Sequence, residues 1–272
     1  MTNRSISPTF GFLGTGNMGS ALARAAAKSV PGDRILLSNR TPAKAEALAA
    51  ELNASAVTNR TVAAEADFIF LGVKPQMMAG LMEEIRPVLM ERKGGFVLVS
   101  MAAGLTMERI RAMSGMECPV IRILPNTPCA IGEGIILYTC DSSVTAAQKE
   151  AFLAAMGAAG RLAPIEEHLI NAGSTISGSA PAFTAMFMEA LADGAVACGL
   201  PRAAAMEFAA QMLVGTAKLY LQNGQHPGAM KDAVCSPAGS TIQGVRALEA
   251  GGFRSAVTEA VIATYEKNLA LG

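Results

Sequence analysis

Short runs of apolar residues recur along the first 163 residues, and most are followed by a segment of helical character. The runs are 10–13, 34–38, 68–71, 96–99, 120–124 and 134–138. Because they contain few polar positions, we expect strands that are buried on both faces, as in a parallel sheet covered by helices on either side. Residues 1–163 are therefore predicted to form an α/β, doubly wound Rossmann domain.

The pattern changes after residue 163, where Ala, Met, Leu and Gly dominate and no further strand is expected. Apolar residues within 253–265 follow helical spacing, and residues 182–198 are apolar on nearly every side apart from Glu189 and Asp193. A helix that is apolar all round must be buried. The simplest partner is a second subunit. Residues 164–272 are therefore predicted to be an all-α dimerisation domain, with a compact monomeric bundle as the alternative.

Composition narrows the classes of partner. The 22 basic and 22 acidic residues cancel, which gives no reason to expect nucleic acid or an anionic membrane as a partner. Residues 169–188 carry no charge, but they include Asn171, Ser174 and Pro181, and we expect a buried segment rather than a membrane span. The five cysteines lie at no zinc or redox spacing, so reduced thiols, no metal site and a cytoplasmic location are expected.

A glycine-rich loop follows the first predicted strand and opens a helix. Its glycines are Gly14, Gly16 and Gly19. In a dinucleotide-binding loop the first glycine permits the tight turn, the second lets the pyrophosphate approach the backbone, and the third lets helix and strand pack closely. This loop predicts a nucleotide site. The candidate cofactor residues here are Gly14, Thr15, Gly16, Asn17 and Met18.

The end of the second strand bears on the choice of nucleotide. NAD enzymes usually carry a carboxylate there for the ribose 2′-hydroxyl, whereas this chain has Ser38, Asn39, Arg40 and Thr41. A guanidinium and two hydroxyls suit a 2′-phosphate. We therefore expect Ser38, Asn39 and Arg40 to bind the cofactor and NADPH to be preferred, the alternative being that Arg40 is only a solvated surface residue.

Three later turns lie at the carboxyl ends of predicted strands, where ligands bind in parallel sheets. The first contains Val73, Lys74 and Pro75, with a helix expected to begin at Pro75. In the second, small residues around Ala102 leave room for a nicotinamide ring. In the third, Asn126 can position a carboxamide or a substrate. These five residues are further candidates for the cofactor site, with ordinary turn chemistry as the alternative for each.

A second candidate site lies near the C-terminus. Ser236 is a suitable N-cap and Pro237 suits the first position of a helix, so a helix is expected to begin there. The small residues Ala238 and Gly239 would leave the amides of the first turn open. Unpaired N–H groups and the helix dipole make such an end a binding site for a small anion.

These residues resemble the pyrroline-5-carboxylate reductases, from about residue 9 to the end of the chain. The marks on the nucleotide side are residues 14–19, 73–75 and 125–128, which several reductases share. Residues 177–183, of sequence SGSAPAF, are more specific. So is the stretch that begins at His226-Pro227-Gly228 and ends at Leu248-Glu249.

The resemblance implies a Rossmann domain, a helical domain that interleaves with its twin, and NADPH as the preferred donor, with NADH as the alternative. It implies the final step of proline biosynthesis, the reduction of 1-pyrroline-5-carboxylate to L-proline, in a cytoplasmic homodimer with a decamer as a further assembly. Carried over by position, the substrate loop is Ser236 to Thr241. The amides of Gly239 and Ser240 would bind the substrate carboxylate, and the catalytic hydroxyl of Thr241 would hydrogen-bond the imine nitrogen.

One residue departs from the family's pattern. Ala238 stands where the family usually has glycine, and a positive φ at this position would strain an alanine.

Two other functions remain open. A 3-hydroxyacid dehydrogenase of the same plan would need a lysine soon after Gly178, but the next lysine is Lys218. A non-catalytic NADP-binding protein would need no second anion site. The two histidines, His168 and His226, supply no triad or metal set, and His226 is expected to be structural. A protonated cyclic imine is already electrophilic, so its reduction needs no strong general acid.

Overall fold

The computed structural model describes residues 7–270, and the chain divides into two compact units. The second unit is Ser179–Glu266. The first contains the described residues up to Gly178 together with those from Lys267 onward. The last strand of the first unit ends at Pro164, one residue beyond the predicted domain boundary at 163. The helical turns between this strand and Gly178 belong with the sheet-containing unit.

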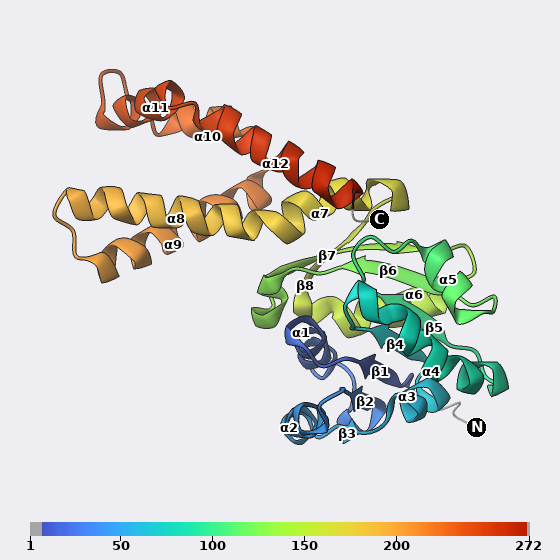
Figure 1. The fold of residues 1–272 in the computed structure, drawn as a ribbon. Helices are drawn as coiled ribbons and strands as arrows, with labels where there is room; N and C mark the ends of the chain where they lie inside the picture. Colours follow the sequence, from blue (N-terminus) through green and yellow to red (C-terminus); the bar gives the residue numbers. More distant parts are fainter. Residues whose placement is uncertain (1–6, 271–272) are drawn as a thin grey trace. The chain divides into compact units, whose positions relative to one another are not determined.

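The described residues of the first unit form an eight-stranded sheet with the order β3-β2-β1-β4-β5-β6-β7-β8 (Figure 1). Its strands are β1 (Phe10–Leu13), β2 (Ile35–Ser38), β3 (Ser55–Ala56), β4 (Phe68–Leu71), β5 (Val97–Ser100), β6 (Val120–Leu124), β7 (Gly134–Cys140) and β8 (Gly160–Pro164). All the predicted strands are present, with bounds that differ by at most two residues. The order reverses between β1 and β4, so the doubly wound fold is confirmed.

The sheet differs from the prediction at its two edges. Neither β3 nor β8 is an apolar run: β3 is two exposed residues, and β8 begins with Gly160 and Arg161. In addition, β7 pairs antiparallel with β6, from Ile121 opposite Cys140 to Leu124 opposite Leu137. The expectation of a parallel sheet is therefore wrong at this edge, because an apolar run reports burial on both faces and not strand direction.

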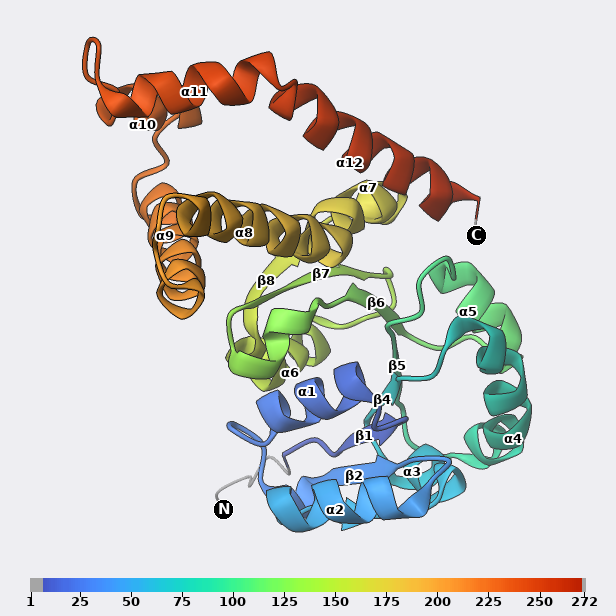
Figure 2. The ribbon, with the colours of Figure 1, turned by 60° about the vertical axis from the view of Figure 1, so that its left-hand side comes forward.

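Helices cover both faces of the sheet (Figure 2). One face carries α1 (Asn17–Ala26), α2 (Pro42–Leu52) and α6 (Ala146–Met156); the other carries α3 (Asn59–Glu65), α4 (Met78–Glu91) and α5 (Met107–Ser114). Successive strand residues point to opposite faces. Phe10 and Phe12 stack on Phe68 and Phe70 under α1, with ring centroids 4.9 and 4.5 Å apart. Leu13 belongs to the cluster on the other face.

The rest of the described chain is helical, as predicted. The helices are α7 (Ile170–Ser174), α8 (Ala180–Ala197), α9 (Arg202–Asn223), α10 (Pro227–Ala233), α11 (Ser240–Ala250) and α12 (Phe253–Leu269), with a π-helical turn at Thr175–Ser179. Within the second unit, α8 and α9 form an antiparallel hairpin (Figures 1 and 2). No helix in residues 7–270 is long and apolar enough to cross a membrane.

The second unit buries little apolar surface of its own. The buried apolar side chains of residues 179–266, all of which are described, are Ala192, Ala205 and Ala209. Larger apolar side chains are exposed instead: Phe208 and Leu221 of α9 are 58% and 66% exposed. An open apolar groove of about 410 Å³ is lined by Phe183, Phe187 and Phe253 among others. Apolar surface of this extent marks an interaction site.

Candidate active site

The loops after β1 and β4 meet at the point where the strand order reverses. Gly14 has φ 105° and donates its N–H to the carbonyl of Ser38 at 2.8 Å. Gly72 donates its N–H to the carbonyl of Leu13 at 2.8 Å. A Cβ on Gly14 would lie 2.6 Å from the carbonyl oxygen of Gly72. Both the left-handed backbone and the close approach therefore require glycine at position 14, as the sequence predicts.

The rest of the loop has the features expected of a pyrophosphate site. Gly16 is the N-cap of α1, and a Cβ there would meet nothing within 4 Å, which leaves the amides of the first turn approachable. A Cβ on Gly19 would collide with the carbonyl of Gly14, so the third glycine allows helix and strand to pack. Thr15 is buried, and its Oγ1 has no hydrogen-bond partner in the described structure. A buried hydroxyl without a partner in this loop is compatible with a phosphate group bound there.

The end of β2 carries a chain of hydrogen bonds that the sequence does not reveal. Ser38 Oγ donates to Asn59 Oδ1 at 2.7 Å, and Asn59 Nδ2 donates to Glu84 Oε2 at 2.9 Å. Asn39 accepts the N–H of Thr15 at 3.2 Å. Ser38, Asn39 and Asn59 line a cavity of about 370 Å³, whose other lining residues come from α2 and from residues 56–58. Asn59 is the residue that sequence reasoning missed, because only the fold brings it beside the end of β2.

Arg40 follows this strand and is exposed. Within residues 7–270 its guanidinium makes no hydrogen bond or ion pair. It remains available for an anionic group at the end of β2.

The loops after β4 and β5 lie at the same carboxyl end of the sheet. Lys74 is exposed and caps a 3₁₀ turn, Pro75–Met77, that leads into α4. The helical region thus begins at Pro75 as expected, although its first turn is 3₁₀. Val73 is half-buried, and Ala102, which lies in the loop after β5, is buried. The strands β1, β2, β4 and β5 are parallel neighbours. The structure therefore brings the candidate cofactor residues in the loops after these strands to the same end of the sheet, the end at which the strands finish.

Asn126 follows β6 at this end of the sheet, but part of its side chain has a structural role. Its Oδ1 accepts the N–H of Ile135 at 2.9 Å and the thiol of Cys129 at 3.7 Å. These contacts hold the start of β7 beside the end of β6. Its Nδ2 makes no hydrogen bond within the described residues, so a donor is left for a carboxamide or a substrate.

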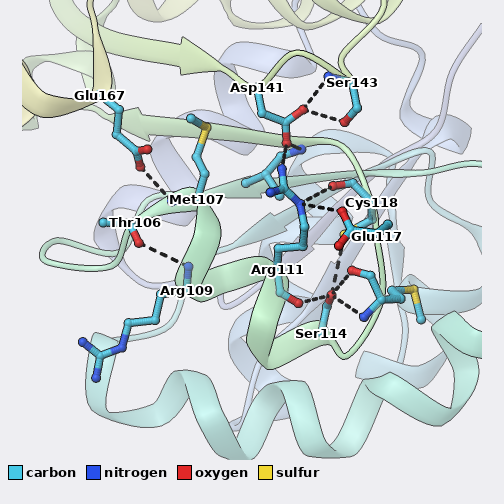
Figure 3. A network of polar contacts seen from close by, with 12 residues as sticks. Thr106, Met107, Arg109, Arg111, Ser114, Glu117, Cys118, Asp141, Ser143 and Glu167 are labelled. Carbon is cyan, nitrogen blue, oxygen red and sulfur yellow. Dashed lines mark hydrogen bonds and ion pairs between the residues drawn. The ribbon is translucent and has the colours of Figure 1, made fainter.

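A second polar network connects α5 with the strands beside it (Figure 3). Glu167 accepts the N–H of Met107, the first residue of α5, at 2.7 Å, and pairs with buried Arg122 at 3.2 Å. At the other end of the helix, Arg111 pairs with Asp141, which also accepts the N–H of Val120 at 2.9 Å. The network fixes α5, and with it the loop that carries Ala102.

Residues 236–241, which the resemblance predicts to be the substrate loop, lie in the second unit, and their form differs from the prediction. The helix begins at Ser240 with Gly239 as N-cap, so Ser236 is not the N-cap and Pro237 is not the first helical residue. Gly239 instead donates its N–H to the carbonyl of Ser236 at 3.0 Å, which closes a β-turn. Proline is favoured at the second position of such a turn and also at the first position of a helix. The local sequence therefore fits both a helix that begins at Pro237 and a β-turn over residues 236–239.

Ala238 has a φ of 57° at the third position of this turn. A positive φ is required there in a type II turn, which glycine adopts without cost. The condition under which an alanine at this position would be strained, a positive φ, is therefore met.

Ser240 and Thr241 begin α11, and both are exposed. The N-cap has no side-chain hydrogen bond, so the first amides of the 11-residue helix are open to an anion. The side chain of His226 accepts the N–H of Gly228 at 3.1 Å and caps α10. This contact agrees with the structural role predicted for it. Among residues 7–270, no three His, Cys, Asp or Glu side chains are grouped as a metal site.

Together the sheet and its loops define a class of protein: a two-unit oxidoreductase with a dinucleotide-binding fold followed by an all-helical unit. Residues 9–104 match the family described as NADP oxidoreductase coenzyme F420-dependent, and residues 167–271 match the pyrroline-5-carboxylate reductase dimerisation family. The pyrroline-5-carboxylate reductase of Escherichia coli is 40% identical, with 95% of this chain and 96% of the relative covered. The pyrroline-5-carboxylate reductase of Pisum sativum is 34% identical, with 97% of this chain and 96% of the relative covered. The chain belongs to the pyrroline-5-carboxylate reductase family.

Solved structures agree with this assignment. A pyrroline-5-carboxylate reductase from Coxiella burnetii superposes with a TM-score of 0.89 at 28% identity, covering 98% of this chain and 99% of that chain. The Plasmodium falciparum pyrroline carboxylate reductase, whose structure has NADP bound, gives a TM-score of 0.85 at 28% identity, with coverage of 97% and 98%.

Proposed function

We propose that this enzyme reduces the cyclic imine 1-pyrroline-5-carboxylate to L-proline with NADPH, the final step of proline biosynthesis. The observation that carries the proposal is the near-complete overlap with reductases of this name, at 40% identity over 95% of the chain. The glycine loop after β1 and the open helix start after Gly239 lie within the matched length. A hydroxyacid dehydrogenase is not favoured by these relatives.

The nucleotide would be held by the loops after β1, β2, β4 and β5. The amides around Gly16 and the free Thr15 hydroxyl suit the pyrophosphate. Arg40 suits the 2′-phosphate of NADPH, which supports that nucleotide as the preferred donor over NADH. Lys74 and Asn126 would contact the ligand nearer the nicotinamide. When bound, the nucleotide supplies the hydride.

The substrate would be held by the loop before α11. The amides of Gly239 and Ser240 would bind its carboxylate at the helix start, and the turn closed by Ser236 holds those amides in place. The hydroxyl of Thr241 would hydrogen-bond the ring nitrogen. The imine carbon accepts the hydride, the nitrogen keeps its proton, and the product is a secondary amine. Positioning can supply much of the rate of such a reaction.

Assembly completes the proposal. The exposed side chains of α9 and the apolar groove lined by Phe183, Phe187 and Phe253 would be covered by a second copy of the chain. The match of residues 167–271 to a dimerisation family supports a homodimer. A decamer built from such dimers and a cytoplasmic location, with no nucleic-acid or membrane partner, complete the expected picture.

The test is direct. Purified protein is incubated with 1-pyrroline-5-carboxylate and either NADPH or NADH, and both the loss of reduced nucleotide and the formation of proline are measured. 3-Hydroxyacids with NADP⁺ form the comparison. Proline formation with the imine and no turnover of the hydroxyacids would support the proposal. Nucleotide binding without turnover of either substrate would contradict it.

A further inference from the structure

The three-residue relay at the end of β2 has a fixed direction. A carboxylate can only accept hydrogen bonds, so Glu84 turns the NH₂ group of Asn59 toward itself at 2.9 Å. The amide oxygen of Asn59 then faces Ser38 and accepts its hydroxyl hydrogen at 2.7 Å. Glu84 belongs to α4, and Asn59 is the first residue of α3. Two helices on one face of the sheet therefore set the direction of the hydrogen bond that Ser38 of β2 makes.

This direction decides what Ser38 offers to the cavity that it lines. Its only hydrogen is already donated to Asn59, so Ser38 Oγ presents lone pairs and no donor. A ribose 2′-hydroxyl can donate to those lone pairs. A 2′-phosphate carries acceptor oxygens and gains no hydrogen bond from Ser38 in this arrangement. Ser38 therefore favours the nucleotide without the phosphate, contrary to the sequence-based expectation that its hydroxyl suits a 2′-phosphate. Arg40 favours the nucleotide with the phosphate.

We propose that Glu84 is a specificity-determining residue that acts through Asn59 on Ser38, holding Ser38 as a hydrogen-bond acceptor and so restraining the preference for NADPH over NADH. The inference rests on the proposed nucleotide site. Glu84 itself touches no nucleotide in this scheme. It acts by fixing the orientation of the Asn59 amide. Arg40 and the relay together set the ratio of the affinities for NADPH and NADH.

The first test is Glu84→Gln. An amide in place of the carboxylate can donate as well as accept, so Asn59 is no longer held in one orientation and can rotate to donate to Ser38 instead. The Ser38 hydroxyl hydrogen is then free for a phosphate oxygen. We expect the ratio of the dissociation constants for NADH and NADPH to rise about tenfold, the worth of one charge-assisted hydrogen bond. Calorimetric titration of the full-length protein with each nucleotide measures this ratio without turnover.

Removal of the Glu84 charge would by itself favour a phosphate, so the same substitution is repeated in a Ser38→Ala background. A charge effect persists there, whereas an effect through the relay disappears because the hydroxyl is gone. Glu46→Gln, which removes a carboxylate from the lining of the same cavity, measures the charge effect separately. Ser38→Ala alone should weaken NADH binding several-fold and leave NADPH binding within about twofold.

An equal shift for Glu84→Gln in both backgrounds would overturn the proposal, and so would a loss of NADPH binding on Ser38→Ala that matches the loss of NADH. A wild-type protein that binds neither nucleotide would instead contradict the proposed function. Glu84 is exposed, so the substituted chain is expected to fold, and thermal unfolding verifies that it does.

Discussion

The backbone N–H of Gly239 lies 3.0 Å from the carbonyl oxygen of Ser236, and this hydrogen bond closes a turn in which Ala238 has a φ of 57°. The left-handed region costs a residue with a Cβ about 1–2 kcal/mol. Ala238→Gly should therefore stabilise the protein by about 1 kcal/mol, measured by thermal unfolding at constant protein concentration. In the same unit, Ala229→Gly lies within α10 and should destabilise by about 1 kcal/mol. Equal effects of the two substitutions would rule out strain at Ala238.

Arg40 is predicted to favour NADPH. Arg40→Asp replaces an exposed, unpaired guanidinium with a carboxylate that repels a 2′-phosphate. The preference for NADPH over NADH should fall by about ten- to a hundredfold, measured as the ratio of kcat/KM values. Lys93→Asp makes the same charge change in the loop between α4 and β5, at the amino end of β5 and so away from the carboxyl ends of the strands, and should leave the ratio unchanged. Parallel losses with both nucleotides in Arg40→Asp would refute the role.

Thr241 is predicted to hold the imine nitrogen. Thr241→Val keeps the shape of the side chain and removes the hydroxyl, so kcat/KM for the imine should fall about tenfold, as expected for the loss of one good hydrogen bond. The same exchange at Thr258, an exposed residue of α12, serves as the control. A kcat/KM within about threefold of the wild-type value would count against the role, since even a weak hydrogen bond contributes about that much.

Glu167 links the first amide of α5 to the buried guanidinium of Arg122, whose side chain is 3% exposed. Glu167→Ala would leave that charge without its ion pair, and we expect a loss of about 2–3 kcal/mol in the free energy of unfolding. The neighbouring Glu166 is 77% exposed, and its carboxylate pairs with the exposed His168. Glu166→Ala should therefore change stability by less than about 1 kcal/mol. Similar values for the two variants would show that the ion pair contributes little.

Asp141 should contribute to the dependence of stability on pH. Burial raises its pKa, but hydrogen bonds from Ser143, Val120 and Arg111 outweigh burial and hold the pKa below its usual value. A carboxyl group of this kind stabilises the fold above its unfolded pKa of about 3.9, and the contribution is lost as the pH falls through the folded pKa.

We therefore expect Asp141→Asn to cost about 1–3 kcal/mol at pH 7 and to flatten the loss of stability below about pH 4, measured by urea unfolding across pH. Asp33→Asn, at an exposed residue, should cost little at neutral pH. An unchanged acid limb in Asp141→Asn would contradict this assignment.

The pattern of apolar and polar residues predicted most of the sheet, but none of the hydrogen bonds and ion pairs between side chains that are distant in the sequence. Strands β1, β4 and β6 begin and end where their apolar runs do, because burial on both faces leaves a continuous local signal. The direction of β7, the two edge strands β3 and β8, and the partner of Ser38 left no such signal. The helix predicted at Ser236 begins at Ser240, because Ser-Pro suits a turn as well as a helix start and only the surrounding chain decides between them.

What the amino-acid sequence alone determined is local: the buried runs, the glycines at positions 14 and 16, the absence of a carboxylate at the end of β2, and the presence of alanine at position 238. Each follows from the properties of a residue and its immediate neighbours. The tertiary structure decided which distant groups meet, such as Glu84 with Asn59 and Glu167 with Met107. Hydrogen bonds of that kind depend on the positions of two separate elements, and those positions are set by packing of the whole sheet rather than by either segment.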